Sequence, residues 1–102
     1  MSKIRVAICD DMPQILRHFK KIIQAAGDME VVAEAETGKE MVALADKLQP
    51  DIILMDIQME SEDAGILATN KILSEHPDIK VIILTVHKED DLIFRAYGAG
   101  AI

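Results

Sequence analysis

The sequence is poor in aromatic residues and cysteine, and it lacks a long uninterrupted apolar run. With no tryptophan, one tyrosine and two phenylalanines, its core must be built mainly from aliphatic side chains. Its single cysteine, Cys9, cannot form an internal disulfide, so we expect a reducing, cytoplasmic setting. No apolar stretch approaches the roughly 20 residues of a membrane-spanning helix. We therefore expect neither a signal peptide nor a membrane partner.

Positive charge is also scarce. Lysine and arginine number 11 against 18 aspartate and glutamate residues, which gives a net charge of −7 at pH 7. Because nucleic-acid backbones and anionic membranes attract basic surfaces, this balance argues against direct binding to either. A cation or a basic protein partner fits better. The 102 residues are enough for one compact domain and too few for two.

What the sequence does contain is a regular alternation of two patterns. Short aliphatic runs predict strands at 4–9, 29–33, 52–55 and 81–84, with a fifth strand starting at 101–102. Amphipathic stripes predict helices at 13–26, 41–48, 65–75 and 89–97. Strands that alternate with helices favour a parallel sheet covered by helices on both faces, which is an α/β fold.

Polar residues follow the predicted strands where each one ends. Asp10 and Asp11 follow the first strand, Asp56 the third and Thr85 the fourth, so all should meet at one edge of the sheet. Asp11 could instead cap the first helix, and Asp10 could be a turn residue. Asp56 follows four apolar residues, and a buried carboxylate is costly unless it is paired or bound to a metal. The cluster therefore predicts a hard cation, with Mg²⁺ the usual choice.

Three motifs carry a family resemblance over essentially the whole chain. The runs at 8–11, 53–59 and 82–85 resemble, in order and spacing, the receiver domain of bacterial two-component response regulators. The resemblance implies a flavodoxin-like, doubly wound parallel sheet with strand order 2-1-3-4, followed by a fifth strand. The sequence looks most like receivers of LuxR/NarL-type regulators, which implies that DNA is bound only through a separate output domain.

The resemblance also implies a role for each site residue. Asp56 would be the phosphoacceptor, phosphorylated by a sensor histidine kinase. Asp11 would bind Mg²⁺ or Mn²⁺ directly, Asp10 partly through water, and Asp56 and the backbone carbonyl of Gln58 would complete the protein ligands. Thr85 would contact a phosphoryl oxygen and act as a switch. Such a domain is a signalling phosphoacceptor rather than an enzyme, although it assists its own phosphorylation and dephosphorylation.

The sequence departs from the family pattern in three places, one of which is Val86 after Thr85, where a smaller residue is common. The family's lysine after the fifth strand, and the fifth helix, are absent from the 102 residues. We therefore expect residues 1–102 to be one incomplete receiver domain with an output domain downstream, and its fourth strand to favour self-association. The loop at 60–65 is one residue longer than usual and more acidic, and it begins with Glu60 in place of proline.

Three alternatives compete with this interpretation. The missing lysine would suit a degenerate receiver that works only as a protein-interaction module. A metal-dependent phosphohydrolase is disfavoured, because such an enzyme usually has a second acid two residues after its nucleophile, where this chain has Gln58. A flavin-binding domain is disfavoured because the acidic first loop, at 10–13, would repel a phosphate. Cys9 is expected to be a small core residue.

Overall fold

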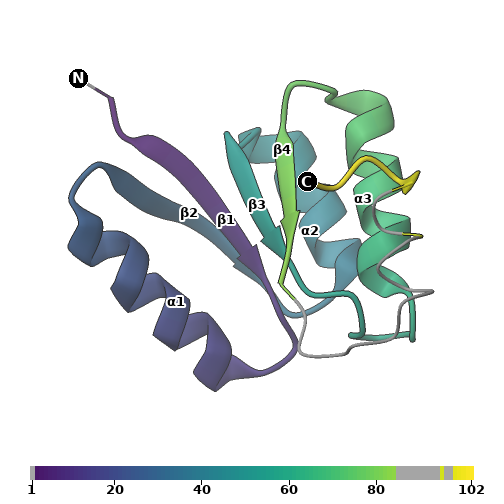
Figure 1. Ribbon diagram of the computed structural model, residues 1–102, viewed down its shortest axis with the longest axis horizontal. Coiled ribbons are helices and arrows are strands. Elements are labelled where there is room, and N and C mark those ends of the chain that lie inside the picture. The colour runs from purple at the N-terminus through teal and green to yellow at the C-terminus, as the bar shows by residue number, and fades with distance from the viewer. Residues whose placement is uncertain (1, 85–94, 96–97) are drawn as a thin grey trace.

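Strands and helices alternate along the chain in the computed structural model, which describes residues 2–84, 95 and 98–102. The elements are β1 (Ile4–Cys9), α1 (Pro13–Ala26), β2 (Met29–Ala35), α2 (Gly38–Leu48), β3 (Ile52–Met55), α3 (Ala64–Glu75) and β4 (Lys80–Ile83). The strands form one parallel sheet in the order β2-β1-β3-β4 (Figure 1). The predicted fold class and strand order are confirmed.

Helices cover both faces of the sheet, with α1 on one face and α2 and α3 on the other (Figure 1). Alternate residues of β1 serve the two faces, as the strand period requires. Val6 and Ile8 pack in a cluster with Leu16 and Ile23 of α1. Two-sided burial explains why the central strands are apolar without alternation.

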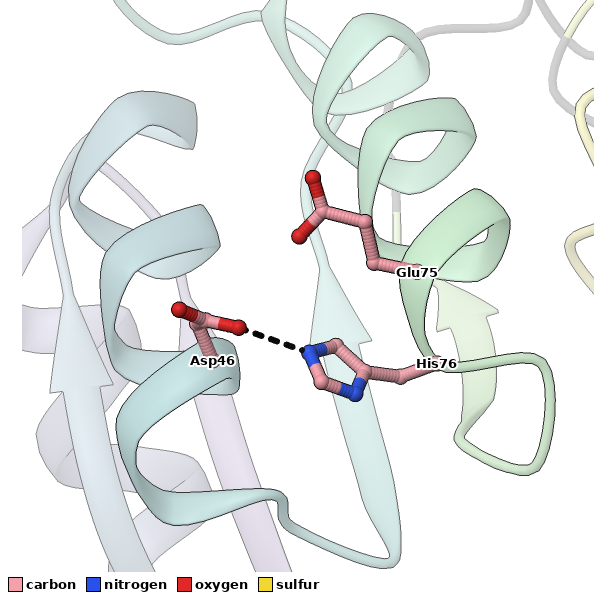
Figure 2. A group of neighbouring side chains, drawn as sticks. All are labelled: Asp46, Glu75 and His76. Atoms are coloured by element: carbon pink, nitrogen blue, oxygen red, sulfur yellow. Dashed lines mark hydrogen bonds and ion pairs between the residues drawn. The ribbon is translucent and has the colours of Figure 1, made fainter.

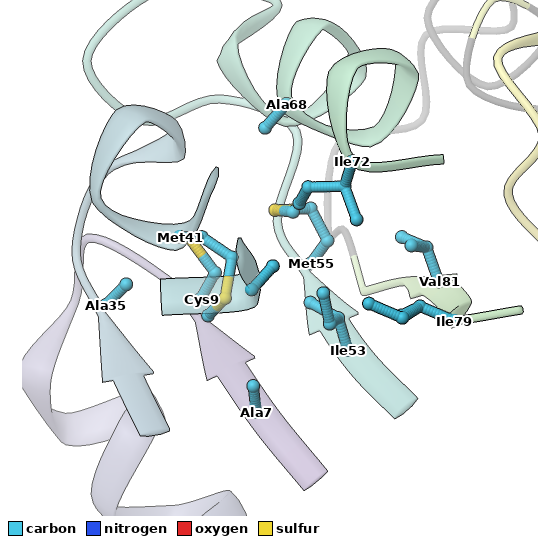
Figure 3. Close-up of a cluster of buried hydrophobic side chains, with 11 residues drawn as sticks. Ala7, Cys9, Ala35, Met41, Ile53, Met55, Ala68, Ile72, Ile79 and Val81 are labelled. Atoms are coloured by element: carbon cyan, nitrogen blue, oxygen red, sulfur yellow. The ribbon is translucent and has the colours of Figure 1, made fainter. Parts of the chain in front are cut away.

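The larger core lies between the sheet and the α2–α3 pair. Figure 3 shows Met41 of α2 and Ile72 of α3 reaching toward Met55 of β3. The buried members of this core are Ala7, Cys9, Ala35, Met41, Ala45, Ile53, Met55, Ala68, Ile72, Ile79 and Val81. Most of these side chains are aliphatic, so the predicted aliphatic core is confirmed.

Local signals set the ends of the first two helices. Pro13 opens α1, and Gly27 ends it in the left-handed region with φ 85°, as expected from their backbone preferences. The Thr37 hydroxyl caps α2 by accepting a hydrogen bond from the Glu40 N–H at 3.1 Å. Gln49 ends α2 with φ 45°.

The structure differs from the sequence prediction at strand boundaries. β2 continues to Ala35, which pairs with Cys9, and β4 spans Lys80–Ile83 instead of 81–84. Backbone pairing with a neighbouring strand decides where a strand ends, and this pairing cannot be predicted from the apolar pattern of the sequence. The predicted helix at 89–97 lies outside the described residues except for Arg95.

The end of the chain lies beside β4. The Ile102 N–H donates to the Val81 carbonyl oxygen at 2.9 Å, and Ala101 is buried. Residues 101–102 are not a strand of the described sheet, which has four strands, so the fifth strand predicted to start there is not formed, although the chain end lies beside β4. None of the helices in the described part of the chain is long and apolar enough to cross a membrane.

Candidate functional site

The three aspartates predicted to meet at one edge of the sheet do so. Oxygen atoms from Asp10, Asp11 and Asp56 all lie within 4.8 Å of one another. Cys9 at the end of β1 pairs with Met55 at the end of β3, so the residues after them emerge side by side. Asp10 and Asp56 are only 8% and 9% exposed, whereas Asp11 is exposed.

The backbone holds Asp56 at the end of β3. Its N–H donates to the Cys9 carbonyl oxygen at 2.9 Å, which continues the pairing between β1 and β3 past the last strand residue. Its Oδ1 atom accepts a hydrogen bond from the N–H of Ile57 at 2.9 Å. A hydrogen bond to a carboxylate is stronger than one between neutral groups, so this contact orients the side chain.

Asp10 combines a turn role with a place in the acidic cluster. Its Oδ1 accepts from the Met12 N–H at 2.9 Å, so the turn interpretation is correct for one oxygen. Burial raises the pKa of Asp10 against the opposing effect of the Met12 N–H, and the charge of Asp11 raises it further. The N-cap residue of α1 is Met12. The alternative that Asp11 caps this helix is therefore wrong.

Gly65 brings the first turn of α3 against the backbone of the site. Its N–H donates to the Ile57 carbonyl oxygen at 2.8 Å. A Cβ added to Gly65 would overlap the carbonyl oxygen of Asp56 and lie 2.8 Å from the Ile57 Cα. Our sequence interpretation missed this role, although an isolated glycine within a helical pattern was the available signal.

Glu60 links the loop after β3 to the start of α2. Its two carboxylate oxygens accept hydrogen bonds from the N–H groups of Gly38 at 2.7 Å and Lys39 at 3.0 Å. Partial burial would raise the pKa of Glu60, but these backbone N–H groups outweigh it and hold the pKa below its usual value. A carboxylate is favourable at a helix N-terminus. The sequence held no signal for this contact.

The remaining predicted residues fall into three cases. Thr85 lies outside the described residues. Gln58 is half-buried in the loop after Asp56, and the role of its carbonyl as a ligand stays a prediction. Cys9 is 1% exposed, and burial together with the charges of Glu60 and other nearby acids raises the pKa of its thiol far above the usual value. The thiol therefore stays protonated, as a core residue should.

This arrangement has two chemical capacities. An all-oxygen donor set on rigid strand ends suits a hard divalent cation such as Mg²⁺. A buried, oriented carboxylate beside such a cation can act as a nucleophile.

Comparisons with known proteins agree with this geometry. The sequence matches the family "Response regulator receiver domain" over residues 6–102. It is 42% identical over 101 residues to the uncharacterized transcriptional regulatory protein YxjL of Bacillus subtilis, covering 99% of this chain and 46% of that protein. It is 42% identical over 99 residues to the transcriptional regulatory protein LiaR of the same species, covering 97% of this chain and 46% of that protein. The chain thus spans about half the length of these relatives.

A solved structure shows the same fold. The crystal structure of a LuxR-family two-component response regulator from an Aurantimonas species superposes with a TM-score of 0.89 at 30% identity. The match covers 98% of this chain and 71% of that one.

Proposed function

Because the chain belongs to the response regulator receiver domain family, we propose that Asp56 accepts a phosphoryl group from a histidine residue of a sensor kinase. The observation that carries this proposal is the meeting of Asp10, Asp11 and Asp56 at one edge of the sheet. An Asp56 oxygen forms a bond to phosphorus as the phosphorus–nitrogen bond of the donor breaks. The donor nitrogen keeps the electron pair and takes up a proton.

The residues of the cluster fit Mg²⁺, with Mn²⁺ as an alternative. Asp10, Asp11 and Asp56 offer oxygen donors within 4.8 Å of one another, and burial together with the charge of Asp11 raises the pKa of Asp10. The carbonyl of Gln58 is a further proposed ligand. When bound, the cation supplies positive charge against the oxygens of the transferring phosphoryl group.

The protein's own groups position the phosphoacceptor. The Ile57 N–H orients the Asp56 carboxylate, and Gly65 allows α3 to begin directly against the Asp56 backbone. Glu60 ties the loop between them to α2. Thr85, which follows β4 in the sequence, is proposed to contact a phosphoryl oxygen and to pass the change on to partner surfaces.

We further propose that residues 1–102 are the receiver part of a cytoplasmic transcriptional regulator. Support comes from relatives named as transcriptional regulators, of which the chain spans about half the length. DNA contact would belong to a separate output domain, in agreement with the net charge of −7. On this proposal the domain is a signalling phosphoacceptor and not an enzyme with its own substrate. The alternative is an interaction module that works without phosphorylation.

Replacing Asp11 by alanine is expected to remove most of the affinity for Mg²⁺. We expect binding in the millimolar range for the unaltered chain, near −4 kcal/mol or about 1 mM, and a loss of at least about tenfold on substitution, since a ligand is removed. The measurement is a Mg²⁺ titration followed by NMR. In the unaltered chain, shifts should centre on Asp10, Asp11 and Asp56.

Asp28→Ala is the matched control, because it removes one exposed negative charge at the start of β2, away from the cluster. It should leave the Mg²⁺ affinity unchanged. Equal losses in both variants would mean that net charge, not coordination, governs binding. Absence of any shift near the three aspartates would contradict the site.

The edge position of β4 leads to a proposal about self-association. In the described part of the sheet β4 is an outer strand. The Ile102 N–H pairs with its Val81 carbonyl oxygen, and the aliphatic edge beyond that contact invites pairing with another chain. We expect the 102-residue chain to self-associate in sedimentation experiments, and Ile82→Lys to suppress this because a charge within an edge strand discourages pairing. Ile22→Lys, at a 51% exposed position on α1, is the control. A chain that stays monomeric at high concentration would refute the idea.

A further inference from the structure

A second group of potential metal ligands lies at the opposite end of the sheet from the aspartate cluster. It consists of Asp46, Glu75 and His76, and one ligand atom from each lies within 4.8 Å of the other two. Figure 2 shows the His76 ring pointing from α3 toward Asp46 on α2. The His76 Nε2 and Asp46 Oδ1 atoms are 3.0 Å apart. The role proposed for Asp56 leaves this group unexplained.

The fold holds the imidazole in place. His76 is the C-cap residue of α3, and its backbone N–H donates to the Ile72 carbonyl oxygen at 2.7 Å. Its side chain is 18% exposed, whereas that of Asp46 is 68% exposed. A half-buried imidazole on a fixed backbone therefore faces a carboxylate that solvent and ions can reach.

Charge at this place favours a cation. Asp46 lies in the last turn of α2, and Glu75 is the last residue of α3, so both carboxylates sit where helix carbonyl groups already carry partial negative charge. Lys71 meets Glu75 at 3.4 Å, but this exposed pair is weak and can yield to a stronger ligand. A bound cation would offset the unfavourable placement of both carboxylates.

We propose that Asp46, Glu75 and His76 bind one Zn²⁺ ion. One imidazole nitrogen with two carboxylate oxygens suits zinc, whereas Mg²⁺ prefers an all-oxygen shell. Two ligands at about 2.0 Å from a tetrahedral zinc are about 3.3 Å apart, close to the 3.0 Å between His76 Nε2 and Asp46 Oδ1. A rotation of the exposed Glu75 side chain completes three protein ligands, with water as the fourth. The ion would join the ends of α2 and α3.

The test is calorimetric titration of the whole chain with Zn²⁺, in excess Mg²⁺ so that the aspartate cluster competes little. We expect one Zn²⁺ per chain, and a loss of at least about tenfold in affinity for both His76→Gln and Asp46→Asn. His18→Gln, at an exposed histidine on α1, is the matched control and should bind as the unaltered chain does. Asp46→Asn changes an exposed residue, so it keeps the test valid if His76→Gln fails to fold.

The outcomes separate this site from its alternatives. X-ray absorption of the zinc-loaded chain should show one imidazole nitrogen among oxygen ligands, and Asp11→Ala should retain full Zn²⁺ affinity. Unchanged affinity in Asp46→Asn and His76→Gln would overturn the proposal and leave a hydrogen bond between α2 and α3. A loss of Zn²⁺ affinity in His18→Gln equal to that in His76→Gln would also overturn the proposal. The result does not depend on whether Asp56 is phosphorylated.

Discussion

Replacing Asp56 by asparagine is expected to abolish phosphorylation of the regulator by acetyl phosphate in the presence of Mg²⁺. The physical reason is that an amide group has no anionic oxygen with which to attack phosphorus. Because Asp56 is 9% exposed and oriented by the Ile57 N–H, no neighbouring carboxylate is expected to take its place. Mass spectrometry of the intact protein measures the phosphorylated fraction, which should fall from most of the protein to none.

Asp78→Asn provides the matched control, since it makes the same chemical change at an exposed turn at the other end of the sheet. Its phosphorylation should equal that of the unaltered protein. Equal phosphorylation of Asp56→Asn would contradict the assignment of the phosphoacceptor. If the unaltered regulator itself takes up no phosphoryl group from acetyl phosphate or from its kinase, the interaction-module alternative is favoured.

Replacing Gly65 by alanine is expected to lower the free energy of unfolding by about 3 kcal/mol or more. In an ordinary helix the same change would stabilise by about 1 kcal/mol. Here the new Cβ would overlap the Asp56 carbonyl oxygen, and it would lie 2.8 Å from the Asp56 carbonyl carbon. Backbone cannot move aside as a flexible side chain can, so α3 or the end of β3 must shift. Urea unfolding measures the loss.

The control for this prediction is Gly98→Ala. Among the described residues, no atom lies within 4 Å of a Cβ added to Gly98, so this variant should lose little or no stability. Gly65→Ala should also weaken Mg²⁺ binding, because a displaced backbone moves the Asp56 carboxylate. If Gly65→Ala is as stable as the unaltered chain, the close approach between α3 and β3 does not exist in solution.

The sequence by itself determined the fold class and the location of the aspartate cluster. Parallel strands buried on both faces need uninterrupted aliphatic runs, and such runs are visible at 52–55 and 81–84. Strands that run the same way end at the same edge of the sheet, so the residues after them meet whatever the details of packing. The gathering of Asp10, Asp11 and Asp56 follows from order and direction alone.

Only the tertiary structure decided which ordinary polar residues make long-range contacts. Glu60 reaches the N–H groups that open α2, and His76 reaches Asp46 from 30 residues away. Such side chains are common on surfaces, and nothing in their local sequence distinguishes them. Their partners depend on how α2, α3 and the loop after β3 pack together. The packing sets distances to within an ångström, and a pattern of residue types along the chain carries no such information.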